Sequence, residues 1–223
     1  PYGAHAEKIG KQFWTHLGHI AAADPEAIGF AASMEPVAPD ACWKAELDKW
    51  EKVIDEDELQ PQPVARAAIR WLRRNPPAPA EKISVVHGDY RTGNFLYDGE
   101  GDIRAILDWE MCHLGDPLED VAWALDPLWA FERPERPGGM IARDEALRIW
   151  EQASGLKAEP VRLLWWEIFN SLKGLAIWIS SGKEYQTGAN RDPILAFPSW
   201  YCTDVHNRVL VNRLAALSKE ARI

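Results

Sequence analysis

Apolar residues recur at three- and four-residue spacing along most of this chain, which is the pattern of amphipathic helices. In the first such segment Ile9, Phe13, Leu17 and Ile20 fall on one face. The same spacing predicts helices over about 5–23, 40–54, 62–74, 117–126, 143–153, 160–181 and 199–218.

The middle of the chain has a different pattern. Residues 83–86 form a short apolar run that predicts a buried strand. Residues 95–97 and 103–107 flank the turn-forming sequence 98–102, which contains two glycines and two aspartates and predicts a β-hairpin. We therefore expect an α+β fold that is mostly α, with a small central hairpin.

Glycine, proline and acidic runs predict where these elements end. Gly155 and Gly182 are placed to follow helix C-termini. The acidic run 55–58 predicts a solvated turn, and residues 185–199, with two prolines and a glycine, predict a long loop that rims a site.

Composition excludes several classes of protein. The net charge of −9 argues against a nucleic-acid binder with a basic surface. No apolar run reaches the roughly 20 residues that a membrane span needs, so no membrane partner is expected. The three cysteines, Cys42, Cys112 and Cys202, form no CxxC pair, which argues against a zinc site or a disulfide framework and fits a cytoplasmic protein. His16 and His19 are interpreted as a helix surface, because a pair of histidines without a third ligand rarely binds a metal.

The richest chemistry lies in the sequence His-Gly-Asp-Tyr-Arg-Thr-Gly-Asn, residues 87–94, and in Asp108, fourteen residues further on. Antiparallel strands return the chain to its starting point, so the predicted hairpin brings Asn94 and Asp108 together. Their oxygens are the ligand type that Mg²⁺ prefers. Asp89 stands slightly apart and is free to accept a proton from an attacking hydroxyl. This is the arrangement that a Mg²⁺-dependent phosphoryl transferase needs.

The motif resembles the catalytic loop of the protein-kinase-like fold, in its aminoglycoside phosphotransferase and choline kinase branch. Asp108-Trp109-Glu110 matches the position of the kinase Asp-Phe-Gly, and residues 115–122 resemble that family's Gly-Asp-Pro segment. Tyr90 and Arg91 resemble a branch related to phosphotransferase domains associated with acyl-CoA dehydrogenases. The specific motifs occupy 85–123, which we expect to be the catalytic and metal-binding core of a lobe spanning 1–223.

The resemblance implies a role for each matching residue. Asp89 is then the catalytic base or the residue that orients the hydroxyl, while Asn94 and Asp108 hold Mg²⁺ on the phosphates of ATP or GTP. The residues expected to support the catalytic loop are His87, Arg91, Asp116 and Asp120. Asp116 is expected to act as a helix N-cap and Asp120 as a carboxylate that orders the loop.

A hydroxylated small molecule is the expected acceptor, and helices after the motif line its pocket in the family. Glu110, Glu167, Asn170 and Lys173 are therefore candidate substrate-binding residues. Arg91 replaces the histidine common in antibiotic-modifying members, which disfavours an aminoglycoside. The acidic charge permits an amine, whereas Tyr90 and Arg91 favour other hydroxylated metabolites such as hydroxyacyl thioesters. ATP or GTP, and the oligomeric state, stay open.

One departure from the family is large. Its N-terminal lobe carries a nucleotide-covering loop and a phosphate-binding lysine, and no β-rich segment with these features precedes residue 80. The chain is therefore interpreted as the C-terminal lobe alone, with Pro1 as the cut end of a longer protein and with weak activity by itself. The alternative function is a non-catalytic binding or regulatory module.

Overall fold

The computed structural model describes residues 2–130, 133 and 135–220. The chain divides into two compact units, one formed by residues 1–43 and 77–167 and the other by residues 44–76 and 168–223. Two helices, α2 (Cys42–Asp57) and α6 (Pro160–Thr187), run from one unit into the other. No helix in the described part of the chain is long and apolar enough to cross a membrane.

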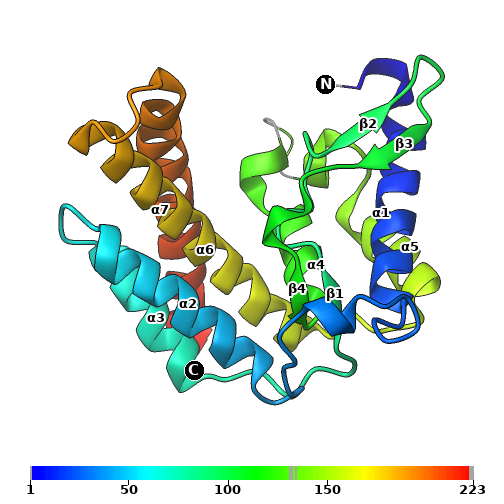
Figure 1. The fold of residues 1–223 in the computed structure, drawn as a ribbon, viewed down its shortest axis with the longest axis horizontal. Coiled ribbons are helices and arrows are strands. Elements are labelled where there is room, and N and C mark those ends of the chain that lie inside the picture. The colour runs from blue at the N-terminus through cyan, green and yellow to red at the C-terminus, as the bar shows by residue number, and fades with distance from the viewer. Residues whose placement is uncertain (1, 131–132, 134, 221–223) are drawn as a thin grey trace. The chain divides into compact units, whose positions relative to one another are not determined.

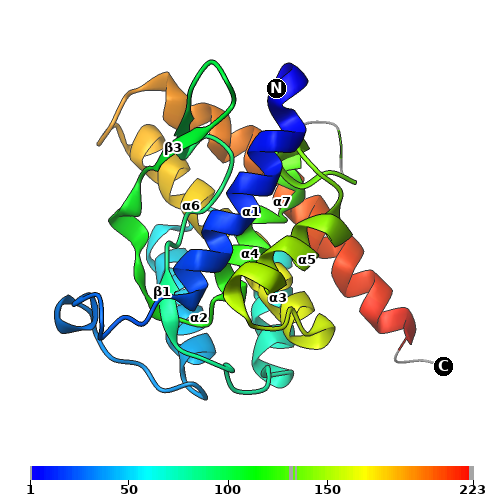
Figure 2. The same cartoon turned by 90° about the vertical axis from the view of Figure 1, so that its right-hand side faces the viewer.

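The first unit is built around helix α1 (Ala6–Ala22), which packs along α5 (Arg143–Ser154) (Figure 1). The buried face of α1 includes Ile9, Phe13 and Leu17, as the spacing predicts. Gly18 permits the close approach of the two helices, since a Cβ at that position would lie 2.5 Å from the Cβ of Ala153 and 2.9 Å from the carbonyl oxygen of Trp150. The two helices also lie beside each other in a second view (Figure 2).

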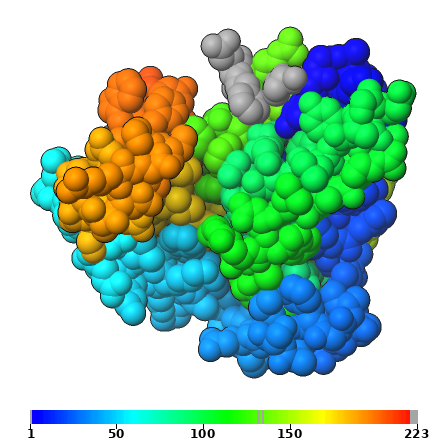
Figure 3. All heavy atoms as spheres, turned by 45° about the horizontal axis from the view of Figure 1, so that its top comes forward, coloured from blue at the N-terminus to red at the C-terminus, as the bar shows by residue number. Residues whose placement is uncertain are grey.

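In the described part of this unit, four short strands form two separate antiparallel pairs. Strand β1 (Ser84–Val86) pairs with β4 (His113–Gly115), and β2 (Phe95–Tyr97) pairs with β3 (Ile103–Ile106). The β2–β3 pair is the predicted hairpin, and it lies at the molecular surface beside the N-terminal end of α1 (Figure 3). Strand β4 was not predicted, because its three residues have no alternating pattern of their own and are defined by pairing with β1.

The first unit is completed by the short helix α4 (Leu118–Ala124) and by 3-10 turns at Gly3–His5, Ala31–Ser33, Trp109–Met111, Pro127–Ala130 and Pro137–Gly139. All seven residues of α4 are buried. A helix that short has no stable amphipathic face of its own, so its position depends on the packing around it.

The second unit is helical and contains α3 (Pro63–Arg74), α7 (Pro193–Glu220) and the parts of α2 and α6 that fall within it. The interpretation of Gly182 as the residue after a helix C-terminus was wrong, since α6 continues to Thr187. The glycine that follows the helix is Gly188, whose φ is +78°. A Cβ on Gly182 would lie 2.9 Å from the Cβ of Ser199, so this glycine serves the packing of α6 on α7.

The expectation of a long loop over 185–199 was also wrong. Helix α7 begins at Pro193, where the missing N–H of proline costs nothing, and it includes Pro198. Only residues 188–192 separate α6 from α7. Pro193 and Pro198 favour a loop when read along the sequence, but Pro193 is the first residue of α7 and Pro198 lies inside it.

The acidic run 55–58 is not a solvated turn, because α2 continues to Asp57. Arg66 on α3 contacts Asp55 at 2.5 Å and Glu58 at 2.8 Å, and Lys183 on α6 contacts Asp57 at 2.8 Å. The acidic residues therefore connect three helices of the second unit.

We expect Gly18→Ala to destabilise the protein by about 1–3 kcal/mol, because the added methyl overpacks the contact between α1 and α5. This cost exceeds the gain of about 1 kcal/mol that alanine brings to a helix interior. Urea unfolding measures the difference. The matched control is Gly99→Ala, where a Cβ meets nothing within 4 Å, and equal stability of the two variants would contradict the prediction.

Candidate active site

The loop that follows β1 is fixed by one buried carboxylate. Asp120 of α4 accepts the backbone N–H of His87 at 2.6 Å and that of Gly88 at 2.9 Å. Gly88 has φ +84°, and a Cβ there would lie 2.5 Å from the carbonyl oxygen of Met111, so only glycine fits this turn. The structure thus places Asp120 where a loop-ordering carboxylate is expected.

The imidazole of His87 connects the two motif segments. Its Nδ1 accepts the backbone N–H of Asp89 at 3.1 Å, so its Nε2 carries the proton and donates to the carbonyl oxygen of Leu107 at 2.9 Å. This tautomer follows from the bonding pattern. The ring also packs on Trp109, with 4.5 Å between centroids. His87 therefore holds the backbone of Asp89 and the residue before Asp108 in a fixed relation.

Tyr90 anchors the same loop to α1. Its hydroxyl donates to the carbonyl oxygen of Phe13 at 2.7 Å, and the two rings lie 4.4 Å apart. Burial is complete and raises the pKa of Tyr90 well above its ordinary value, so the phenol stays protonated and continues to donate.

The carboxylate of Asp89 is half-buried and receives three N–H donors. Arg91 donates from Nε at 3.0 and 3.1 Å, Trp123 from Nε1 at 2.7 Å, and Asn94 from Nδ2 at 2.7 Å. The guanidinium of Arg91 in turn lies 4.8 Å from the ring of Trp129. Each carboxylate oxygen thus accepts two contacts, one of them from the N–H that Arg91 shares between the two oxygens, and together these contacts fix the orientation of the carboxylate.

Asn94 and Asp108 lie next to each other across the hairpin. The N–H of Leu107 donates to the carbonyl oxygen of Asn94 at 2.8 Å, which places Asp108 one residue beyond that pair. Asp108 has φ +67°, and within the described residues it is the one non-glycine residue with positive φ. Aspartate tolerates this conformation better than most residues do.

The oxygens of this pair suit a hard cation. The Nδ2 of Asn94 donates to the carbonyl oxygen of Asp89 at 2.9 Å as well as to its carboxylate, so the amide oxygen faces the other way. The Asp108 side chain is exposed. Among the described residues neither Asn94 Oδ1 nor the Asp108 carboxylate has a protein partner, so both fit the oxygen coordination of Mg²⁺.

Asp116, at the end of β4, has two functions in the fold. Its Oδ1 accepts the N–H of Leu118, the first residue of α4, at 3.0 Å, but the N-cap position belongs to Pro117 and not to Asp116 as expected. Its Oδ2 accepts from Arg162 at 2.6 Å and from Trp166 Nε1 at 3.1 Å. Asp116 thus ties α4 to the first turns of α6.

The four candidate substrate residues have different surroundings. Glu110 is exposed in the 3-10 turn after Asp108. Glu167 is buried and contacts Arg143 at 2.5 Å. Asn170 and Lys173 belong to the second unit, where both are buried and Lys173 Nζ lies 5.7 Å from the ring of Trp50. Substrate binding by these residues stays a prediction.

Two tryptophans near Asp89 were not singled out from the sequence. Trp123 bonds the carboxylate, and Trp129 packs on both Trp123, at 5.3 Å between centroids, and Arg91. Trp123 lies seven residues after Asp116. Its position in the sequence does not show whether its indole bonds a carboxylate or only fills the core.

Comparison with known proteins matches a family model described as "Phosphotransferase enzyme family" over residues 1–156. Acyl-CoA dehydrogenase family member 11 of Homo sapiens is 31% identical over 124 residues, which are 52% of this chain and 16% of that protein. The probable acyl-CoA dehydrogenase IBR3 of Arabidopsis thaliana is 31% identical over 132 residues, with the corresponding shares 50% and 16%. The chain thus spans a small part of these curated relatives.

Solved structures show the same fold. A provisionally assigned aminoglycoside phosphotransferase from Ralstonia eutropha aligns with a TM-score of 0.80 at 19% identity, over 96% of this chain and 68% of that one. A macrolide 2′-phosphotransferase from Brachybacterium faecium aligns with a TM-score of 0.57 at 19% identity, over 85% of this chain and 60% of that one. The resemblance drawn from the motifs and the expected fold class are confirmed.

We expect Asp120→Asn to cost about 2–3 kcal/mol of stability, because an amide replaces one of the two acceptors with a donor that faces a buried N–H. Urea unfolding measures this loss. The matched control is Asp24→Asn, an exposed residue whose side chain accepts the N–H of Glu26 at 3.0 Å, and there asparagine makes the same turn bond. A loss at Asp120 no larger than at Asp24 would contradict the prediction.

Proposed function

Because the chain belongs to the phosphotransferase enzyme family, we propose that it provides the catalytic core of a small-molecule O-kinase. Such an enzyme transfers the γ-phosphoryl group of ATP or GTP to a hydroxyl of its acceptor. The observation that carries the proposal is that Asn94 bonds the carboxylate of Asp89 through its side chain and the N–H of Leu107, the residue before Asp108, through its backbone carbonyl.

The chain's residues would divide the work between them. Asn94 and Asp108 would hold Mg²⁺, which neutralises charge on the transferring phosphoryl group when it is bound. Asp89 would accept the hydrogen bond of the acceptor hydroxyl in place of one of the two contacts that Arg91 Nε shares between its oxygens, and so direct the hydroxyl oxygen at phosphorus. With three donors already on the carboxylate, orientation of the hydroxyl is a larger part of its role than proton abstraction.

Arg91 and Trp123 are positioning residues in this proposal. They fix the Asp89 carboxylate from one side, and Asn94 fixes it from the other. The acceptor class is not set by these contacts. The relatives named above suggest three acceptors to compare, namely an aminoglycoside, a macrolide and a hydroxyacyl thioester, and the last is favoured by the likeness to acyl-CoA dehydrogenase family members.

We expect Asp89→Asn in the full-length protein to lower kcat by about 10²–10⁴-fold, because the amide no longer offers the carboxylate's lone pair to the hydroxyl. The affinity for Mg·ATP should change little, since Asp89 is not a proposed metal ligand. Transfer of labelled phosphate from ATP or GTP to the three acceptors gives the rate, and calorimetry gives the affinity. Asp144→Asn, at an exposed position on α5, is the matched control. A wild-type rate in Asp89→Asn would refute the assigned role.

We expect Asp108→Asn to weaken nucleotide binding in the presence of Mg²⁺ by about tenfold or more, because one anionic oxygen ligand is lost. Binding measured with EDTA should be the same in both proteins. If Mg²⁺ has no effect on nucleotide binding by the wild-type protein, the chain is better described as a non-catalytic module.

A further inference from the structure

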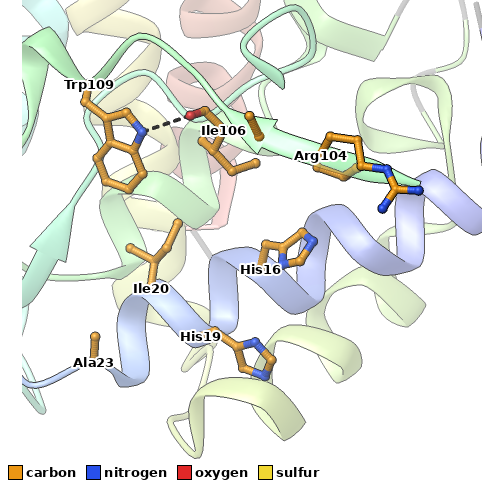
Figure 4. A pocket seen from close by; sticks show the side chains of 9 residues that line it. His16, His19, Ile20, Ala23, Arg104, Ile106 and Trp109 are labelled. Carbon is orange, nitrogen blue, oxygen red and sulfur yellow. Dashed lines mark hydrogen bonds between the residues drawn. The ribbon is translucent and has the colours of Figure 1, made fainter. Parts of the chain in front are cut away.

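A pocket lies in the first unit, between the C-terminal half of α1 and strand β3 (Figure 4). Its volume is about 490 Å³, which is within the range of small-molecule sites. None of Asp89, Asn94 and Asp108 is among the residues that line it. It is therefore separate from the candidate metal and phosphoryl-transfer cluster.

The lining is an apolar body with a few polar groups at one end. Ile20, Ile106 and Trp109 face one another across the pocket (Figure 4), and Ala23, Ile103 and Ala105 extend the apolar wall. The polar groups are His16, His19 and Arg104, and no acidic side chain of a described residue lines the pocket. Asp98 and Asp102 contact Arg104 from outside this lining, so an anionic ligand would be recognised by the guanidinium N–H groups that these carboxylates leave unused.

Arg104 supplies the charge that does not depend on pH. Its Nε donates to Asp98 at 2.7 Å, and its Nη2 lies 2.5 Å from Asp98 and 3.8 Å from Asp102. A guanidinium has five N–H donors, so these contacts leave Nη1 able to donate to a ligand. Burial, with a smaller effect of His19, lowers the pKa of His16, whose neutral imidazole is then a hydrogen-bonding group beside the arginine.

The pocket touches the candidate active site through Trp109. Its indole Nε1 donates to the carbonyl oxygen of Ile106 at 3.1 Å (Figure 4). This bond joins the residues on either side of Leu107 and Asp108. The Trp109 ring also packs on His87. The imidazole of His87 accepts the N–H of Asp89 and donates to the carbonyl oxygen of Leu107. A ligand that contacts Ile106 and Trp109 would thus act on the residues that hold Asp108.

We propose that this pocket binds a small amphipathic monoanion, with its apolar body between Ile20, Ile106 and Trp109 and its acidic head at Arg104, and that binding stabilises the Trp109–His87 contact. An effect of this ligand on phosphoryl transfer would rest on the proposed function. The binding and its effect on the loop do not, since neither needs metal or nucleotide.

Octanoate is a suitable probe, and octanamide is its uncharged match. Calorimetry should show octanoate binding to the protein, and Arg104→Gln should weaken it by about tenfold, as expected for one charge-assisted hydrogen bond, with little effect on octanamide. Ala23→Leu fills the pocket and should weaken both ligands. The matched controls are Ala22→Leu and Arg70→Gln, since both positions are exposed and outside the pocket. No octanoate binding, or binding that neither pocket variant weakens, would overturn the site.

Hydrogen exchange without metal or nucleotide tests the effect on the loop. Octanoate should slow exchange at the N–H of Asp89, which does not line the pocket, by about fivefold, at the low end of usual coupling between sites. Trp109→Leu removes the ring contact with His87, so the slowing should be lost in this variant even at octanoate concentrations that saturate it. Binding to the wild-type protein with unchanged exchange at Asp89 would overturn the coupling. Both results are independent of whether the chain transfers a phosphoryl group.

Discussion

The imidazole of His87 is held in one tautomer by two backbone groups, the N–H of Asp89 and the carbonyl of Leu107. Because a neutral imidazole has one donor and one acceptor, both of its nitrogens are used, and the ring cannot rotate without losing both bonds. The chain between these two groups is the loop 89–94 and the β2–β3 hairpin. Their relation to each other, and hence the spacing of Asp89 and Asp108, depends on this ring.

The neighbours of His87 explain why the ring stays in place. Asp120 fixes the backbone of His87 and Gly88, while Trp109 and Tyr90 pack on the ring itself, at 4.5 and 5.7 Å between centroids. A buried carboxylate with two backbone donors is costly to disturb, because removing it leaves two buried N–H groups without partners. The loop is thus rigid before any ligand binds, which favours a site that acts by positioning.

Arg91 gives this site a character of its own. It contacts the carboxylate that the proposed reaction uses and also packs on Trp129, so a cation lies beside the acceptor position. The guanidinium is ion-paired with the Asp89 carboxylate, so the pair is neutral as a whole and its main effect is to orient that carboxylate.

The sequence by itself determined most of the local elements and the family. Periodicity located the helices, the hairpin residues 98–102 fixed the turn that brings Asn94 to Asp108, and the motif residues identified the family. These features are encoded by neighbours within a few residues or by one tight turn, so they can be read along the chain.

Only the tertiary structure decided the rest. It decided that Gly182 packs against Ser199 and does not end a helix, that residues 113–115 form a strand, and that Trp123 bonds Asp89 across 34 positions of sequence. The pocket between α1 and β3 is of the same kind, since Ala23 and Ile103, the nearest residues of its two walls along the chain, are 80 positions apart. Such contacts depend on which surfaces meet when the helices pack, and spacing along the sequence does not specify that.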